Sequence, residues 1–191
     1  MAADAGTAIV PWDDRVANPH LVRWLDRRTE RARPGSAALD VGCGTGDNAA
    51  ELARRGPEVT AFDVSEAAIA VARTRFGDRK IRFVAADILA LPADWQAAFA
   101  LVVEVYTLQV LPPAPRTQAA RALAAAVAPG GTLVVVARGR EPDEPEGQMP
   151  WPLLRREAEA IAAHGLRLVE LDDYLDDESP PVRRLVATFE R

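Results

Sequence analysis

The feature that most constrains this chain is a regular alternation of short apolar runs with helix-like stretches between residues 37 and 137. Runs of this length are typical of buried strands, and a repeated strand–helix order predicts parallel strands with helices on both faces of one sheet. We therefore expect an α/β fold. The expected strands are Ala37–Val41, Val59–Phe62, Ile81–Ala85, Phe99–Val103 and Thr132–Ala137, with helices near 47–55, 66–76 and 116–128.

Helix and turn signals flank these elements. Asn18-Pro19 predicts the start of a helix, because Asn can cap free amides and Pro fits the first helical turn. Pro34-Gly35 is expected to end that helix. Pro129-Gly130-Gly131 predicts a turn into the strand at Thr132–Ala137.

The last third of the chain has a different pattern. A Pro- and Glu-rich loop at 140–152 precedes a helix expected near 153–163 and two strand-like runs, Leu166–Leu171 and Val182–Phe189. The intervening Asp172–Pro181 segment is too polar for a crossover helix, so the two runs are predicted to form an antiparallel hairpin. The resulting sheet has about seven strands, mostly parallel, with an antiparallel C-terminal edge.

Composition narrows the classes of function. The net charge of −5 argues against a dedicated nucleic-acid binder, which needs clustered Lys and Arg. No apolar run approaches the roughly 20 residues of a membrane span, and the N-terminus does not resemble a signal peptide. A single cysteine, Cys43, cannot form an internal disulfide, which favours a reducing compartment, and we expect a cytoplasmic protein. Metal binding is not expected, because the few His and Cys residues lack ligand spacing.

A glycine-rich segment, Gly42–Gly46, directly follows the first expected strand. Such a loop exposes backbone amides at a helix start, where an anion is favoured. The anion is either the pyrophosphate of NAD or the carboxylate of S-adenosylmethionine (SAM). A dinucleotide fingerprint requires a third glycine at position 47, where this chain has Asp47, which would repel a pyrophosphate and attract the ammonium of SAM. A simple tight turn and an NAD-linked oxidoreductase remain alternatives.

Acidic residues follow the next two strands. Asp63 can accept from both hydroxyls of a ribose, although it could also cap the following helix. Asp87 can accept from an adenine amino group while the Ile88 amide donates to a ring nitrogen, or Asp87 is only a turn residue. Val64, Ile88 and Leu89 would form apolar walls around the adenine.

Taken in order, Leu39–Gly46, Val59–Asp63, Ala86–Ile88 and Ala128–Leu133 resemble the motifs of class I SAM-dependent methyltransferases over roughly residues 36–137. The resemblance implies a Rossmann-like fold and SAM as the cofactor. The residues expected to bind the cofactor are Asp40, Gly42, Cys43, Gly44, Gly46, Asp47, Asp63, Val64, Asp87, Ile88 and Glu104.

A narrower similarity concerns the thiopurine, halide/thiol and tellurite-resistance methyltransferases. Four segments carry it: Pro11-Trp12-Asp13, Asn18-Pro19, Val110-Leu111-Pro112-Pro113 and Gly147–Pro152. It implies a small, soft nucleophile as the acceptor. The segment Glu104–Gln109 departs from that pattern and leaves the acceptor open.

Methyl transfer mainly requires that the acceptor be aligned and water excluded. Glu104 and Tyr106 follow the fourth strand and are predicted to orient the substrate, with a capping carboxylate and a half-buried aromatic as the alternatives. Trp12, in an N-terminal lid, and Trp151, in the 140–152 loop, are expected to line the acceptor pocket.

Other polar residues are expected to have structural roles. Gln109 is predicted to be a helix-surface amide, Asp172–Glu178 a solvated hairpin tip, and Cys43 a small packing residue rather than a nucleophile. His20 and His164 are expected to be structural.

We predict a single domain over 1–191, formed by an N-terminal lid and helix (1–35), a cofactor-binding core (36–137) and a substrate loop, helix and hairpin (138–191). Its predicted function is methyl transfer from SAM to a small molecule, with S-adenosylhomocysteine (SAH) as by-product, by a monomer or homodimer. The alternative is a SAM- or SAH-binding protein without methyl transfer, acting in an interaction or a cyclisation.

Overall fold

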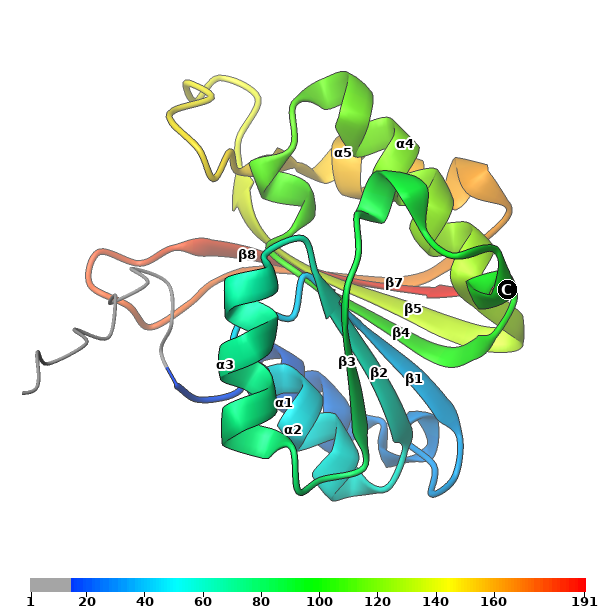
Figure 1. Cartoon of the computed structure of the whole chain (residues 1–191). Coiled ribbons are helices and arrows are strands. Elements are labelled where there is room, and N and C mark those ends of the chain that lie inside the picture. Colours follow the sequence, from blue (N-terminus) through cyan, green and yellow to red (C-terminus); the bar gives the residue numbers. More distant parts are fainter. Residues whose placement is uncertain (1–14) are drawn as a thin grey trace, which may run out of the picture.

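A computed structural model describes residues 15–191. One sheet runs through the molecule with helices on both faces (Figure 1). The helices are α1 (Pro19–Arg27), α2 (Asp47–Arg55), α3 (Glu66–Phe76), α4 (Pro113–Ala126) and α5 (Arg155–Glu159). The strands are β1 (Ala37–Val41), β2 (Glu58–Asp63), β3 (Ile81–Ala85), β4 (Phe99–Val105), β5 (Val127–Arg140), β6 (Leu153–Leu154), β7 (Arg167–Leu175) and β8 (Arg183–Glu190).

The strand order is β3-β2-β1-β4-β5-β8-β7, and the short β6 pairs with the end of β5. β1 to β5 are parallel, whereas β8 pairs antiparallel with both β5 and β7. The predicted mostly parallel sheet and its antiparallel C-terminal hairpin are therefore confirmed. The order reverses direction between β1 and β4, the position at which open α/β sheets bind their ligands.

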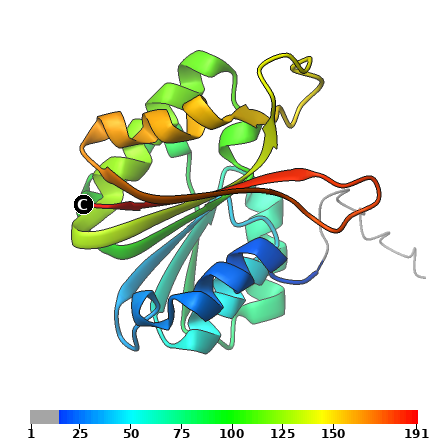
Figure 2. The ribbon, with the colours of Figure 1, turned by 180° about the vertical axis from the view of Figure 1, so that it is seen from behind.

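The central strands are apolar on both faces because helices cover both. α1, α2 and α3 cover one face of the sheet, and α4 and α5 cover the other (Figures 1 and 2). Leu133 and Val135 of β5 pack into the core beside α4, while Val134 and Val136 pack into the core beside α1 and α2. This alternation follows from the twofold repeat of a strand.

The N-terminal helix starts where the sequence predicts but is shorter than expected. The Asn18 side chain accepts hydrogen bonds from the amides of His20 and Leu21, as a helix cap does. The helix ends at Arg27, and a separate 3-10 turn at Thr29–Arg31 occupies the stretch before Pro34-Gly35.

The turn predicted at Pro129-Gly130-Gly131 is wrong, because β5 already begins at Val127. The amide of Gly130 donates to the carbonyl of Arg191, whose own amide donates to Gly131. Arg191 thus gives these glycines the backbone partners of a strand. The glycine segment interrupts the regular pairing of β4 with β5, where the register shifts between Phe99 and Leu101.

The single helix predicted near 153–163 is divided. β6 occupies Leu153–Leu154, α5 covers Arg155–Glu159, and a 3-10 helix completes the segment at Ala160–His164. Glu157 folds back onto the Leu154 amide at the start of α5.

Candidate cofactor and acceptor site

The predicted site residues gather at one edge of the sheet. β1, β2, β3 and β4 are parallel, so the residues that follow each of them lie along the same carboxyl edge. The tip of the β7–β8 hairpin and the 141–152 loop lie at the same end of the molecule (Figures 1 and 2). The residues at this edge include Gly42–Gly46, Asp63, Asp87, Glu104, Tyr106 and Trp151.

Backbone conformation explains the glycines of the loop between β1 and α2. Gly42, Gly44 and Gly46 have φ values of 60°, 51° and 95°, in the region that favours glycine. A Cβ on Gly42 would lie 2.1 Å from the Thr107 hydroxyl oxygen, so this glycine permits close packing. A Cβ on Gly44 would meet nothing within 4 Å, so the backbone at Gly44 is open to an approaching ligand.

Asp63 links the end of β2 to that loop. Its Oδ2 accepts from the Gly44 amide at 2.9 Å, and its Oδ1 accepts from the Ser65 amide at 2.9 Å. The helix-cap interpretation of Asp63 is wrong, because Ser65 caps α3 by accepting from Ala68 at 3.2 Å. Each carboxylate oxygen keeps a free acceptor position beside the glycine loop.

Two buried carboxyl groups lie below the site, Asp40 of β1 and Glu104 of β4. Neither oxygen of Asp40 has a partner in good hydrogen-bond geometry among residues 15–191, although the Ala49 amide lies close enough to lower its pKa against the effect of burial, and Oε2 of Glu104 is likewise unpartnered there. Burial raises the pKa of Asp40 to about 8 and that of Glu104 to about 7. The amide of Leu108 donates to Glu104 Oε1 at 2.9 Å, so Glu104 also shapes the turn that follows β4.

Asp47 lies in the first turn of α2, but its carboxylate is engaged by a neighbouring helix. Arg75 of α3 donates to both oxygens of Asp47 at 2.7 Å. Asp47, which the sequence predicts to attract the ammonium group of SAM, is thus already paired with a guanidinium, which reduces the charge that it can offer to a ligand.

The residues expected around an adenine differ in exposure. Val64 is 76% exposed, whereas Ile88 is 7% exposed and belongs to the core beside α4. Asp87 accepts from the Leu89 amide at 2.9 Å and begins a 3-10 turn. This contact is the one expected of a turn residue. Val64 is free to cover a ligand at the end of β2.

Cys43 lies within the loop, but its side chain turns into the core. It is 7% exposed and packs in the core beside α1 and α2. Burial raises the pKa of the thiol, so a thiolate is disfavoured. Cys43 therefore contributes backbone to the loop and packing to the core, as expected for a small residue.

Tyr106 follows β4 with a left-handed backbone, φ 62°, which is uncommon for an aromatic residue. Its amide donates to Val136 of β5 at 3.0 Å, and its hydroxyl accepts from Arg184 Nη1 of β8 at 2.9 Å. Tyr106 is half-buried, as one interpretation of the sequence held. Its phenol group is held between the ends of β4, β5 and β8.

Gln109 is not a helix-surface amide. It is 1% exposed, its Oε1 accepts from the Arg138 amide at 2.7 Å, and its Nε2 donates to the carbonyls of Arg138 and Trp151 at 3.2 and 2.9 Å. The Trp151 amide donates to the Gln109 carbonyl at 2.8 Å. Gln109 therefore fastens the 141–152 loop to β5 and places Trp151 near the site. Trp12 lies outside the described residues.

The acidic run Asp172–Glu178 is not simply a solvated hairpin tip. The Asp176 side chain is 3% exposed and accepts from Arg184 Nε at 2.6 Å. Although burial opposes it, hydrogen bonds from Val182 and Arg184 hold the pKa of Asp176 at about 2. Glu178 also accepts from Arg184, so this arginine carries two carboxylate partners.

His20 joins this hairpin to α1. Its Nδ1 lies 2.8 Å from the Tyr174 hydroxyl, and its Nε2 lies 3.9 Å from Asp176. Burial lowers the pKa of His20, which favours the neutral ring. The contacts of His20 are those of a structural residue.

Sequence reasoning missed two residues that shape the site. The Thr107 hydroxyl donates to the Val41 carbonyl at 3.1 Å and packs against Gly42. The Asn48 side chain accepts from the Asn18 amide at 2.9 Å and ties the start of α1 to the start of α2. Neither residue belongs to a motif. For Thr107, the one available sign is the glycine at position 42, which leaves room for a close neighbour.

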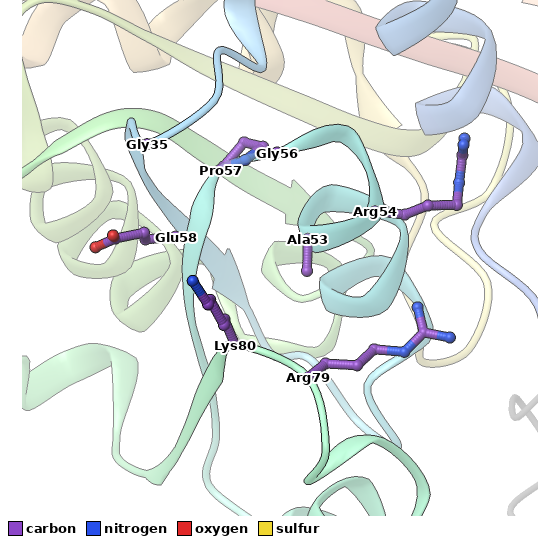
Figure 3. Close-up of a pocket in the computed structure, with 8 residues that line it drawn as sticks. All are labelled: Gly35, Ala53, Arg54, Gly56, Pro57, Glu58, Arg79 and Lys80. Atoms are coloured by element: carbon purple, nitrogen blue, oxygen red, sulfur yellow. The ribbon is translucent and has the colours of Figure 1, made fainter.

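A cavity of about 410 Å³ lies at the opposite, amino edge of the sheet (Figure 3). It is lined by residues before β1, β2 and β3, among them Gly35, Glu58 and Lys80. This position places it away from the glycine loop, so we do not assign it to the cofactor. Across residues 15–191, no helix has the length and apolar character needed to cross a membrane.

Comparisons with known proteins agree with this arrangement. A family model described as a methyltransferase domain matches residues 38–131. An uncharacterized methyltransferase of Mycobacterium tuberculosis (strain ATCC 25618 / H37Rv) is 40% identical over 126 residues, which cover 66% of this chain and 60% of that protein. The chain thus matches about three fifths of the length of this relative.

Solved structures share the fold. The N-methyltransferase NodS from Bradyrhizobium japonicum WM9, in complex with SAH, aligns with a TM-score of 0.75 and 23% identity over 98% of this chain and 93% of that one. The [4+2]-cyclase SpnF aligns with a TM-score of 0.75 and 20% identity over 88% of this chain and 80% of that one.

The strand order, the glycine loop at the switch point and the antiparallel hairpin define a Rossmann-like α/β protein. The methyltransferase family match over residues 38–131, the methyltransferase relative and the shared fold support the class I SAM-dependent methyltransferase superfamily for this chain.

Proposed function

We propose that this protein transfers a methyl group from SAM to a small-molecule acceptor and releases SAH. One relationship carries the proposal: the Asp63 carboxylate binds the Gly44 amide at a position where the loop backbone is open. A ribose acceptor and an anion-binding loop are thereby held side by side. The proposed location is the cytoplasm, in keeping with a lone buried cysteine.

The residues present fit the parts of SAM. The start of α2 would attract its carboxylate through the helix dipole, since the amides of Cys43, Gly44 and Gly46 already donate within the protein. The free acceptor positions of Asp63 would receive the ribose hydroxyls. Val64 and Ile88 would contact the adenine, and Asp87 would accept from its amino group. The unpartnered oxygens of Asp40 and Glu104 would favour a cationic ammonium nearby.

When bound, SAM supplies a methyl group on a positively charged sulfur that is already a good leaving group. The protein then has to align the acceptor and exclude water. Tyr106, whose hydroxyl is fixed by Arg184, would orient the acceptor, and Trp151 would cover it. Glu104, with a pKa of about 7, is able to hold a proton at neutral pH and would act as the base if the acceptor is a hydroxyl.

Two measurements test the proposal. Calorimetric titration should show binding of SAM and SAH but not of NADH. A screen of thiol, amine, hydroxyl and carboxyl acceptors should then show acceptor-dependent conversion of SAM to SAH. NADH binding without SAM binding would refute the proposal, and SAM binding with no turnover across the screen would refute methyl transfer.

The second candidate is a SAM- or SAH-binding protein without methyl transfer. The shared fold of the [4+2]-cyclase SpnF supports this second candidate, since the cyclase and the N-methyltransferase NodS align with this chain at the same TM-score of 0.75. The narrower similarity to thiopurine and halide/thiol methyltransferases supports a thiol as the first acceptor to test.

A further inference from the structure

Arg138, near the end of β5, carries a charge that makes no direct contact with a carboxylate of residues 15–191. Its side chain is half-buried, and its guanidinium has no hydrogen bond or ion pair with any residue from 15 to 191. Burial raises the pKa of the Tyr106 hydroxyl, and the positive charge of Arg138 opposes that rise. A half-buried cation without a partner costs free energy in the absence of a ligand.

Arg138 stands directly opposite a second arginine, Arg184 of β8. Like charges at such a position destabilise the pair of strands. Asp176 and Glu178 neutralise Arg184, as described above, and both of their carboxylates are thereby engaged. Arg184, Asp176 and Glu178 together carry a net charge of −1, so Arg138 balances this cluster at a distance but makes no direct contact with a carboxylate.

The backbone of Arg138 is nevertheless held firmly. Gln109 binds both its amide and its carbonyl, at 2.7 and 3.2 Å, and is itself buried. An arginine with a fixed backbone loses less conformational freedom when it binds a ligand. The position is therefore well suited to recognition.

The side chain also projects toward the site. Val134 and Val136 of β5 pack on the α1 and α2 face, and Arg138 continues that face by strand alternation. Tyr106 packs on the same face and donates its amide to Val136. Arg138 thus follows directly beyond the residue proposed to orient the acceptor.

We propose that Arg138 binds an anionic group of the methyl acceptor, so that the acceptor is a small carboxylic acid. This inference rests on the proposed function. A guanidinium with no direct partner keeps its donors available, and its planar fork matches a carboxylate in geometry.

The experiment uses matched acids and amides as probes: benzoate with benzamide, phenylacetate with phenylacetamide, and indole-3-acetate with its amide. Each is titrated into the full chain saturated with SAH, with calorimetry or ligand-observed NMR as readout. At least one acid should bind tenfold or more tightly than its amide, and Arg138→Gln should abolish that preference. Arg82→Gln, which changes an exposed arginine of β3, is the matched control and should preserve it.

Absence of any acid-over-amide preference, or a preference that survives Arg138→Gln, would overturn the inference. The carboxylate of the cofactor is a second source of the same chemistry. If Arg138→Gln weakens SAH but not 5′-methylthioadenosine, which lacks the amino-acid part, the acceptor assignment is overturned. If the wild-type protein binds no SAH, the proposed function fails, and titration of the unliganded protein still tests Arg138.

The Tm of the unliganded protein distinguishes a ligand-binding role of Arg138 from a structural one. Arg138→Met removes the charge and keeps the apolar stem, so it should raise the Tm of the unliganded protein while it abolishes acid binding. A lower Tm would mark Arg138 as a structural residue and count against the proposal.

Discussion

Asp63 and Gly44 are joined by a hydrogen bond of 2.9 Å from the Gly44 amide to the Asp63 carboxylate, across 19 residues of sequence. The bond brings the end of β2 against the loop after β1. One side chain thereby fixes the shape of the anion-binding loop and presents the acceptor for a ribose. Substitution of either residue should affect cofactor binding more than folding.

Asp63→Asn should weaken the binding of SAH by about 1.5–3 kcal/mol, the usual contribution of hydrogen bonds to a charged group. The amide keeps one acceptor oxygen but loses the negative charge. Calorimetry gives the affinity, and Asp78→Asn, at an exposed position before β3, should leave it unchanged. Unchanged affinity in Asp63→Asn would remove Asp63 from the site.

Gly44→Ala should reduce SAH affinity strongly and stability only slightly. Its Cβ meets no protein atom, so the cost to folding is the strain of a left-handed alanine, about 1–2 kcal/mol. Gly35→Ala is the matched control, because Gly35 also has positive φ and open space but lies at the other edge of the sheet. If both variants bind SAH as the wild type does, the loop is only a turn.

Gly42→Ala should mainly impair folding. Its Cβ would lie 2.1 Å from the hydroxyl oxygen of Thr107, which is fixed by its bond to the Val41 carbonyl. The Tm of Gly42→Ala should fall well below that of Gly44→Ala, and the double variant Gly42→Ala/Thr107→Ser should recover little because the clashing oxygen remains. Equal Tm values for the two glycine variants would contradict this account.

The unliganded protein should lose stability as pH rises from about 5 to 8. Burial raises the pKa of Asp40 to about 8 and that of Glu104 to about 7, above the values near 4 of an unfolded chain. In this pH range the folded protein therefore binds more protons than the unfolded chain does. Raising the pH favours the state that binds fewer protons, which is the unfolded one. Thermal unfolding should give a higher Tm at pH 5.5 than at pH 8.

Asp40→Asn should flatten that dependence, because an amide does not titrate. Asp94→Asn, at an exposed position, should reproduce the wild-type profile. A wild-type Tm that rises between pH 5.5 and pH 8, with the same profile in Asp40→Asn, would contradict this account, because the buried neutral His20 alone favours folding at the higher pH.

Gln109→Ala should destabilise the protein by about 1–3 kcal/mol, since it leaves buried backbone groups of Arg138 and Trp151 without partners. Hydrogen exchange at the Arg138 amide should accelerate, and Trp151 fluorescence should shift toward that of an exposed indole. The exposed Gln96→Ala serves as the control. Unchanged exchange at Arg138 would show that the loop is held by other contacts.

Much of the fold follows from local signals. The bounds of β1 and β3 agree with the prediction, as do those of α2 and α3, because a strand or helix between glycine, proline and capping residues is marked by its immediate neighbours. The order of strands then follows from general rules for parallel sheets, and with it the edge at which the site lies.

The polar contacts of the site could not be predicted in this way. Gln109 resembles a surface amide in sequence, and its role depends on partners 29 and 42 residues away. The pairing of Asp47 with Arg75 is not visible in the sequence, because the two residues are 28 positions apart and share no motif. Motifs show which chemistry a strand end can offer, whereas three-dimensional neighbours decide which of those groups are already engaged.

The attachment of the 141–152 loop has a consequence for protein engineering. Gln109 binds the loop at Trp151 and binds β5 at Arg138, and the pairs Gly139–Leu153 and Arg140–Leu154 close the loop against the end of β5. Both ends are therefore set by residues outside the loop, so its sequence can change without moving the glycine loop. We expect that other loops can be grafted between Arg140 and Leu153 without loss of the fold, and that such grafts change which acceptors the protein prefers.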